Sequence, residues 1–287
     1  MSAGKTTFGV ISPAGGLEPA DFDAGLAALE KLGFALKIFP HARNKSGYLS
    51  APAEERASDL TAAWSDDSLD AILCSRGGFG SAHLLPMLDG ERMKRRRLPL
   101  LGYSDITALH LAMDKFGVGR PVTAPMLKSF AEIDEASLNA FLDVLDKKDH
   151  EFCGVEELTP APNFSGRPLA GNLTVMASLL GTPYFPSPAG RVLFLEEVGE
   201  PLYRIDRLLT QLEQAGVFRV CAGVVFGSFT DGDFTDAELR ELLFRVIKTT
   251  GKPAAMGFPF GHQLPFRALD FTATVTVRNG KIAQLFA

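Results

Sequence analysis

The sequence predicts an α/β protein in two parts, an open, mostly parallel sheet covered by helices and then a smaller, mixed, β-rich part. Three observations predict this class. Apolar strand-like runs alternate with amphipathic helix-like segments from residue 6 to residue 116. The alternation weakens in a proline-rich stretch further along the chain. The C-terminal end then alternates between apolar and polar residues around an Asn-Gly pair, as β-hairpins do.

The first part is expected to alternate between strands and helices. Short apolar runs bounded by turn residues predict strands at 6–11, 34–39, 69–74 and 98–103. Apolar residues at helical spacing predict helices at 19–32, 53–64, 81–88 and 105–116. Gly33 is expected to end the first helix, because glycine readily adopts the left-handed conformation found there. Strands alternating with helices in this way favour a parallel sheet with right-handed crossovers.

The boundary between the two parts is expected where strand and helix periodicity are weakest. An acidic amphipathic helix is expected at 136–145, and a proline-rich stretch follows it. Such segments are typical of domain boundaries. We therefore expect a first domain at 1–135, a linker region at 136–168 and a second domain at 169–287.

The second part has a different pattern of expected helices and strands, and it ends in antiparallel strands. Helices are expected at 171–180, 201–214 and 235–249, and strands at 192–195, 220–229 and 254–258. A hairpin is expected from 271–277 and 282–286, joined by a type I′ turn at Asn279-Gly280. This ending makes the second part mixed rather than wholly parallel.

Composition excludes several classes of protein. The 287 residues are 46% hydrophobic and 22% charged, which is typical of a globular chain and not of a disordered or coiled-coil one. A net charge of −5 argues against a nucleic-acid partner, so the basic run 91–97 is expected to be a solvated loop. No stretch approaches the ~18 apolar residues of a membrane helix. Residues 1–10 lack the pattern of a secretory leader, so a cytoplasmic location without membrane contact is expected.

The three cysteines suggest neither disulfides nor a metal site. Cys74, Cys153 and Cys221 are far apart and odd in number, so they form no disulfide framework and no CxxC pair. Each has apolar neighbours in sequence, which favours buried, inert thiols. The HExxH pattern of zinc peptidases is also absent, and we expect no metal and no cofactor.

The sharpest local feature is a strand that runs into a helix almost without a loop. Ser104 lies at this turn, two residues after Gly102. Such an elbow exposes a side chain at the carboxyl end of a sheet, beside the N–H groups that start the helix. Ile106 stands where a GxSxG motif would have its second glycine, so the pattern is incomplete. A helix N-cap at Ser104 or Asp105 is the simpler interpretation of the same residues.

A glycine-rich segment, Arg76-Gly-Gly-Phe-Gly80, follows the preceding strand. Glycines let backbone N–H groups approach a ligand closely, so this segment could hold a phosphate or an oxyanion, or could be a plain tight turn. Parallel strands that are consecutive in the chain tend to be neighbours in the sheet. This segment and the Ser104 turn are therefore expected to open into one crevice.

A nucleophilic serine needs a base and an acid that orients the base. His262 lies just after an expected strand and is flanked in sequence by a glycine and a polar residue. A purely structural role is the simpler interpretation of this histidine. Glu196 and Glu197 follow a strongly apolar run, and strand alternation predicts that one of them points inward. The other histidines are less suited, because His41 and His150 are expected in solvated loops and His83 and His110 on helices.

These segments together resemble the LD-carboxypeptidase family, serine peptidases that include peptidoglycan-recycling and microcin-immunity enzymes. The resemblance spans about residues 12 to 262. The matching segments, in the family's order, are Arg76-Gly-Gly-Phe-Gly80, Gly102-Tyr-Ser-Asp-Ile-Thr-Ala-Leu109, Ala170-Gly-Asn-Leu173, Leu195-Glu-Glu-Val-Gly-Glu200 with Tyr203-Arg-Ile-Asp-Arg207, and Pro259-Phe-Gly-His262. Phe79 and Ala170 depart from the family's usual residues, Tyr and Gly.

The resemblance implies a Ser–Glu–His triad of Ser104, Glu196 and His262, although Glu197 is only one position away from the aligned acid. It implies an oxyanion hole from the backbone N–H groups of Gly78 and Asp105. It also implies a flavodoxin-like first domain, a β-rich second domain and a homodimer. For substrate binding we expect Asn172 and Arg204. Arg204 and Arg207 lie on one helix face, where they could bind a substrate carboxylate or pair with Glu196 and Glu197.

The expected function is that of a serine carboxypeptidase. It would cleave the L,D-peptide bond before a terminal D-amino acid, turning a murein tetrapeptide into a tripeptide and D-alanine. Within the same family, the substrate could instead be a peptidyl-nucleotide antibiotic or another acyl-amide. From a different class, the 76–80 loop could belong to a non-catalytic phosphate- or sugar-binding module. A class I glutamine amidotransferase is disfavoured, because its elbow nucleophile would be a cysteine and residue 104 is a serine.

Overall fold

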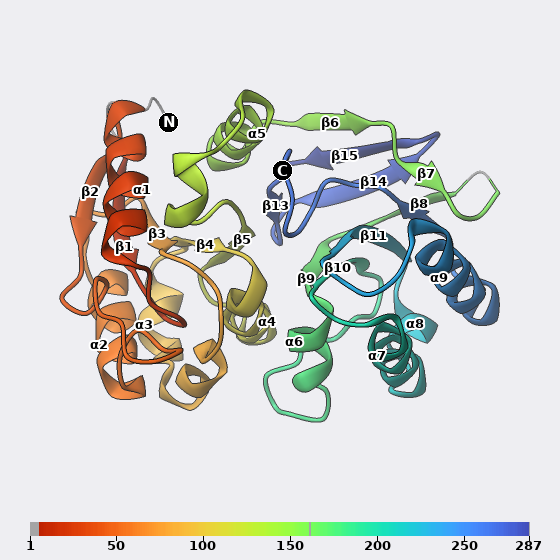
Figure 1. Cartoon of the computed structure of the whole chain (residues 1–287), viewed down its shortest axis with the longest axis horizontal. Helices are drawn as coiled ribbons and strands as arrows, with labels where there is room; N and C mark the ends of the chain where they lie inside the picture. The colour runs from red at the N-terminus through yellow and green to blue at the C-terminus, as the bar shows by residue number, and fades with distance from the viewer. Residues whose placement is uncertain (1–5, 161, 287) are drawn as a thin grey trace.

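The computed structural model describes residues 6–160 and 162–286. The chain forms two parts that lie side by side, with the N-terminal part at the left of Figure 1 and the C-terminal part at the right. Residues 1–5, on which the expectation about a secretory leader partly rests, lie outside the described residues. Among the described residues, no helix has the length and apolar character needed to cross a membrane.

The N-terminal sheet has five parallel strands and one antiparallel edge strand. Its order is β13-β5-β4-β3-β1-β2, and the succession 2-1-3-4-5 of the parallel strands is that of flavodoxin-like folds. The α/β prediction is therefore confirmed. The strands are β1 (Thr7–Ile11), β2 (Ala35–Ile38), β3 (Ala71–Cys74), β4 (Pro99–Gly102), β5 (Arg120–Thr123) and the antiparallel β13 (Leu269–Asp270). The sequence did not predict β5, because Arg-Pro-Val-Thr is short and begins with two residues that are uncommon in central strands.

In the part of the chain that the structure describes, five α-helices and three 3₁₀ helices accompany these strands. They are α1 (Pro19–Lys31), α2 (Ala53–Trp64), η2 (Ser81–Met87), α3 (Gly90–Arg95), η3 (Ser104–Ile106), α4 (Thr107–Phe116), η4 (Leu127–Ala131) and α5 (Glu135–Leu145). The expectation of a loop at 91–97 was wrong, because most of this basic run forms α3. The Asp89 side chain caps α3 by accepting the Arg92 N–H at 3.0 Å, and Lys94 pairs with Glu91 at 2.7 Å.

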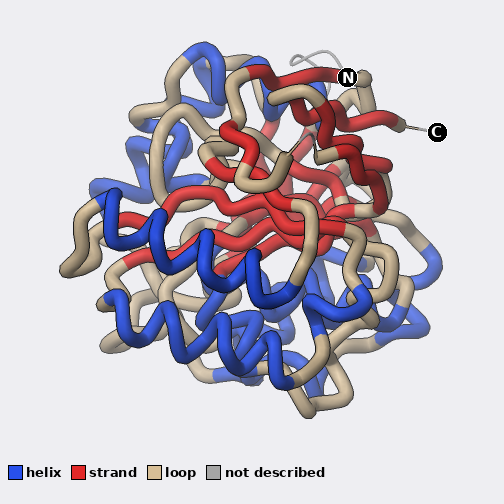
Figure 2. Tube along the Cα trace, turned by 90° about the vertical axis from the view of Figure 1, so that its right-hand side faces the viewer, coloured by secondary structure: helices blue, strands red, loops and turns tan. Residues whose placement is uncertain are grey.

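The C-terminal part contains a mostly parallel sheet and an antiparallel sheet, as expected of a mixed, β-rich part. The first has the order β7-β12-β11-β10-β9 and the second β6-β15-β14-β8. Its strands are β6 (His150–Cys153), β7 (Glu156–Glu157), β8 (Asn163–Gly166), β9 (Pro168–Asn172), β10 (Val192–Val198), β11 (Gly223–Thr230), β12 (Ala254–Met256), β14 (Thr274–Arg278) and β15 (Lys281–Leu285). Its helices are α6 (Leu173–Ser178), α7 (Leu202–Gln214), α8 (Val217–Val220) and α9 (Asp236–Thr250). Figure 2 shows the molecule from the right-hand side of Figure 1. In this view, most strands run above the long helices that face the viewer.

Two segments of the C-terminal part differ from expectation. Gly171 and Asn172, expected in a helix, end strand β9, and α6 begins only after Asn172. A Cβ on Gly171 would collide with Thr107 of α4, so this glycine lets the two parts approach closely. The start of the strand expected at 220–229 is also shifted, because residue 220 ends α8. The predicted hairpin is confirmed, with Asn279 and Gly280 both at positive φ in its turn.

The expectation that all three cysteines are buried was wrong for Cys153. Cys74 and Cys221 are buried, whereas Cys153 is exposed. It lies on β6, at the edge of the antiparallel sheet, where alternate residues face solvent. Burial raises the pKa of the Cys221 thiol to about 11, which keeps it protonated and unreactive near neutral pH.

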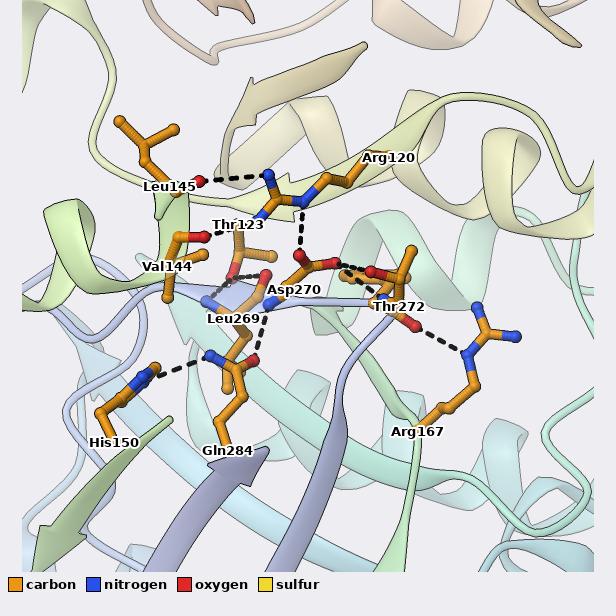
Figure 3. A network of polar contacts seen from close by, with 11 residues as sticks. Arg120, Thr123, Val144, Leu145, His150, Arg167, Leu269, Asp270, Thr272 and Gln284 are labelled. Carbon is orange, nitrogen blue, oxygen red and sulfur yellow. Dashed lines mark hydrogen bonds and ion pairs between the residues drawn. The ribbon is translucent and has the colours of Figure 1, made fainter. Parts of the chain in front are cut away.

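A buried polar network joins the two parts (Figure 3). Strand β13, late in the chain, pairs with β5 of the N-terminal sheet. Arg120 donates from Nε to Asp270 Oδ2 at 2.6 Å, and its guanidinium also donates to the Val144 carbonyl. Gln284 Oε1 accepts the Asp270 N–H at 2.8 Å. Because these groups are buried, they hold the two parts in one relative position.

Candidate active site

Ser104 lies on a strained turn between β4 and the helices that follow. Its φ is 63°, in the left-handed region that non-glycine residues seldom adopt and that costs about 1–2 kcal/mol. Neither Ser104 nor Asp105 makes a side-chain cap to the helix, so the N-cap interpretation does not explain them. A Cβ on Gly102 would lie 2.9 Å from the Ile106 side chain, so the tight turn needs glycine there. The strand-turn-helix elbow predicted from the sequence is therefore present.

The glycine-rich 76–80 loop lies directly against this elbow. Strands β3 and β4 are parallel neighbours, so their carboxyl ends open into one crevice as predicted. A Cβ on Gly77 would lie 2.8 Å from Ser104 Oγ and 3.2 Å from the Asp105 nitrogen. Gly78 follows with a φ of 109° that favours glycine. The loop thus brings backbone within contact distance of the serine hydroxyl.

Asp105 ties the elbow to the glycine-rich loop through its neighbour Ser81. Asp105 Oδ2 accepts the Ser81 N–H at 2.8 Å, and Ser81 Oγ donates to the Asp105 carbonyl at 2.5 Å. Burial raises the pKa of Asp105, and these hydrogen bonds oppose the shift. The side chain of Asp105 therefore has a structural partner, while its backbone N–H lies beside Ser104.

Arg56 is a buried cation behind the loop that sequence reasoning missed. It is 1% exposed and donates to the carbonyls of Pro13 and Gly80 at 2.7 Å each, and of Ala51 at 2.9 Å. Burial lowers its pKa, and the charge of Asp105 opposes that effect. The helix pattern at 53–64 does not predict these contacts, because Arg56 donates hydrogen bonds to loops that are distant in sequence.

His262 bridges the serine and a buried carboxylate. Its Nε2 lies 3.1 Å from Ser104 Oγ, and its Nδ1 lies 2.8 Å from Glu196 Oε2. A carboxylate only accepts hydrogen bonds, so Nδ1 carries the proton and Nε2 is free to accept the Ser104 O–H. The structure thus brings together the three residues that the resemblance implied as a triad.

The loop that carries His262 is positioned by β11 and by a glycine. The Ser228 N–H donates to the Phe260 carbonyl at 2.8 Å, and its hydroxyl donates to the same oxygen at 3.0 Å. Gly261 has a φ of 120°, and a Cβ there would lie 2.7 Å from Glu196 Oε2. The Tyr103 ring meets the imidazole edge-on, with ring centres 5.1 Å apart. These contacts hold the imidazole between Ser104 and Glu196.

Glu196 and Glu197 are both buried, but only Glu196 contacts His262. Burial raises the pKa of Glu196, and its hydrogen bond with His262 opposes the shift. Glu197 accepts a hydrogen bond from Asn172 Nδ2 at 2.9 Å. It also accepts hydrogen bonds from the Thr174 N–H at 2.8 Å and from the Thr174 hydroxyl at 2.7 Å. Of the two carboxylates that the sequence left open, Glu196 is the one in contact with the histidine.

The two residues expected to bind substrate lie in different surroundings. Asn172 is buried; besides bonding Glu197, it caps α6 by accepting the Val175 N–H at 3.1 Å. Arg204 is exposed on α7 and pairs with Glu200 at 3.2 Å, not with Glu196 or Glu197 as considered from the sequence. Substrate binding by Asn172 and Arg204 stays a prediction.

Among the described residues, none of the other histidines contacts Ser104, Glu196 or His262, although His83 packs against Phe79 of the 76–80 loop. His41 is half-buried, with Nδ1 2.9 Å from Asp59 Oδ1, so the expectation that it is simply solvated was wrong. His110 is fully buried on α4 and contacts the Leu100 carbonyl at 2.9 Å. Among the described residues, no cluster of three or more His, Cys, Asp or Glu side chains is arranged to hold a metal ion.

A cavity of about 400 Å³ adjoins the imidazole. It opens beside the carboxyl ends of β4 and β5, and both charged and apolar side chains line it. The residues that line it are Tyr103, Pro125, Lys128, Ser129, Glu132, Ile133, His262, Gln263, Leu264 and Phe266. The sequence indicated no role for Lys128 or Glu132, because neither β5 nor η4, the helix that carries Lys128 and ends just before Glu132, was predicted.

Known proteins resemble this chain in both sequence and structure. The Bacillus subtilis (strain 168) protein named "Probable murein peptide carboxypeptidase" is 31% identical over 96% of this chain and 89% of its own. The crystal structure of muramoyltetrapeptide carboxypeptidase from Oxalobacter formigenes is 25% identical, with a TM-score of 0.89 over 97% of this chain and 98% of that one. An MccF-like protein from Bacillus anthracis str. Ames, 24% identical, shares the fold with a TM-score of 0.89 over 98% and 97% of the two chains.

These matches define the class of the protein as a peptidase, a hydrolase of the carboxypeptidase type. Models of the LD-carboxypeptidase N-terminal and C-terminal domains match residues 8–120 and 165–277. The chain belongs to the LD-carboxypeptidase family.

Proposed function

We propose that this chain is a serine carboxypeptidase that hydrolyses the L,D-peptide bond before a terminal D-amino acid, converting a murein tetrapeptide into a tripeptide and D-alanine in peptidoglycan recycling. One observation carries the proposal: the His262 ring lies 3.1 Å from Ser104 Oγ on one side and 2.8 Å from Glu196 Oε2 on the other. A hydroxyl, an imidazole and a carboxylate in this order can perform acyl transfer. The names of the murein-peptide relatives support the choice of substrate.

In the first half of the reaction, Ser104 Oγ attacks the carbonyl carbon and its proton passes to His262 Nε2. Glu196 stabilises the imidazolium that forms. The backbone N–H groups of Gly78 and Asp105 would stabilise the negative oxygen of the tetrahedral intermediate. The carbon–nitrogen bond then breaks, and the leaving nitrogen takes the proton from Nε2, which releases D-alanine.

In the second half, water attacks the acyl carbon of the acyl-enzyme and gives a proton to Nε2. The carbon–Oγ bond breaks, and Ser104 regains its proton. The products are a tripeptide with a free carboxyl group and the original enzyme. These steps need no metal, so a chelator is expected to leave turnover unchanged.

Incubation with murein tri-, tetra- and pentapeptides, with products identified by mass, tests this function. Release of D-alanine from the tetrapeptide is the expected result. Ser104→Ala should lower kcat by roughly 10³-fold or more, with an unchanged circular dichroism spectrum. Cleavage of an aminoacyl-nucleotide but not of the tetrapeptide would instead favour the acyl-amide alternative. A Ser104 that resists a serine-directed acylating probe would contradict the hydrolase mechanism altogether.

We also propose that the enzyme acts in the cytoplasm as a homodimer, with its two domains divided by the 136–168 region. The sequence pattern and the family resemblance support these points. In the structure, that region contributes α5, β6, β7 and β8. Light scattering on the purified protein tests the dimer; a monomer at micromolar concentration would contradict it.

A further inference from the structure

We propose that Lys128 binds the free carboxylate of the leaving D-amino acid and thereby restricts cleavage to the C-terminal bond. This inference rests on the proposed function. It assigns the cavity beside His262 to the leaving residue, and it assigns to Lys128 the carboxylate recognition that the sequence led us to expect of Arg204.

The direction of proton transfer decides which side of Ser104 the leaving residue occupies. His262 Nε2 must deliver its proton to the leaving nitrogen, so the leaving residue lies on the imidazole side of the serine. The 400 Å³ cavity is on that side, since His262 and Tyr103 line it. No residue of the 76–80 loop lines the cavity. That loop lies against Ser104 instead, where the oxyanion would form.

The lining of the cavity suits a small residue with one negative charge. Pro125, Ile133, Leu264 and Phe266 provide apolar walls. Among the described residues that line it, Lys128 is the only Lys or Arg. A carboxylate bound by an ammonium group forms a hydrogen bond between two opposite charges, whereas the neutral carbonyl of an internal peptide bond offers only a weaker acceptor without the ion pair.

Lys128 is positioned by its backbone and keeps its ammonium group available. Its N–H donates to the Ser75 carbonyl at 3.1 Å, which anchors the start of η4 to the end of β3. Its side chain is exposed, and no ion pair joins it to a carboxylate in the part of the chain that the structure describes. Arg204, by contrast, is already paired with Glu200.

Glu132 carries the opposite charge and lines the same cavity. No ion pair between Glu132 and Lys128 is present among the described residues. The two charges make the cavity close to neutral as a whole. Recognition of the carboxylate would therefore depend on the position of the ammonium group rather than on a general positive field.

The test compares a murein tetrapeptide ending in free D-alanine with the same peptide ending in D-alanine amide. The wild type is expected to prefer the free acid by about tenfold or more in kcat/KM, as a charged hydrogen bond would give. Lys128→Met should abolish this preference, mainly by raising KM for the acid, and Lys128→Arg should restore part of it. Lys115→Met, which removes an exposed lysine from the end of α4, is the matched control and should keep the full preference. A Lys128→Met enzyme with the wild-type preference would overturn the proposal.

A binding measurement separates failure of this inference from failure of the proposed function. Calorimetry with the Ser104→Ala protein measures tetrapeptide affinity without turnover. Adding Lys128→Met should weaken that affinity by about tenfold. Equal affinities would overturn the role of Lys128 even if the wild type releases D-alanine. Absence of D-alanine release by the wild type, with the affinity difference present, would contradict the proposed reaction but not the carboxylate site.

Discussion

Glu196 and Glu197 are adjacent in β10, yet only the Glu196 carboxylate contacts His262. Glu196 accepts a hydrogen bond from His262, while Glu197 accepts hydrogen bonds from Asn172 and Thr174 at the start of α6. The register of β10 against β11 shifts between Leu195 and Glu197, next to these carboxylates. One short strand segment thus supports both the imidazole and the helix beside it.

The two glutamates are predicted to differ when each is replaced by glutamine. Glu196→Gln should lower kcat by about 10²–10⁴-fold, because an amide no longer stabilises the imidazolium. Glu197→Gln should lower the free energy of unfolding by about 1–3 kcal/mol, because its NH₂ group would face N–H donors. Steady-state kinetics and urea denaturation of both variants check this. A Glu197 variant that loses more kcat than the Glu196 variant would contradict the proposed role of Glu196 as the carboxylate that stabilises the His262 imidazolium.

Gly77→Ala is predicted to displace the serine without unfolding the protein. The added Cβ would lie 2.7 Å from Ser104 Cβ and 2.8 Å from Oγ, so one side must move. A shift of about 1 Å at a nucleophile can cost 10²-fold in kcat. Gly90→Ala is the matched control, because a Cβ there meets no atom within 4 Å. Equal kcat values for the two variants would show that the loop does not constrain Ser104.

Asp270→Ala is predicted to destabilise the junction between the two parts. It would leave Arg120 buried without its carboxylate, which typically costs about 3–5 kcal/mol in unfolding free energy. Asp206→Ala removes an exposed pair with Arg245 and should cost no more than about 1 kcal/mol. Chemical denaturation compares the two. Similar losses of unfolding free energy in the two variants would mean that burial does not make the Arg120–Asp270 pair more important for stability than an exposed pair.

His110 is predicted to make stability depend on pH. Burial lowers its pKa from 6.5 to about 4, while its hydrogen bond to the Leu100 carbonyl opposes the shift. Between these values the unfolded chain binds a proton that the folded protein excludes, so stability falls as pH decreases from 6.5 toward 4. The loss should reach about 2–3 kcal/mol near pH 4.

His110→Gln keeps an N–H donor for Leu100 but does not titrate, so it is the comparison for this prediction. Its unfolding free energy should vary less between pH 7 and pH 4.5 than that of the wild type. Denaturant titrations at several pH values measure the difference. Parallel pH profiles for the two proteins would exclude His110 as the cause.

Local patterns in the sequence were sufficient for much of the fold. The elbow at Ser104, the glycine loop at 76–80 and the C-terminal hairpin were all predicted, because each depends on backbone preferences within a few residues. Strand β5 was missed and the end of β9 was predicted as helix. In both cases packing against neighbouring strands outweighed a weak local preference.

The amino-acid order alone determined the alternation of strands and helices and the residue types available for chemistry. Only the tertiary structure decided that His262 meets Ser104 across 158 positions, that Glu196 rather than Glu197 contacts the imidazole, and that Lys128 lies in the adjoining cavity. The physical reason is one of range. Backbone preferences act between near neighbours in sequence, whereas contacts between distant side chains arise when buried surfaces such as β13 against β5 dock in a single register.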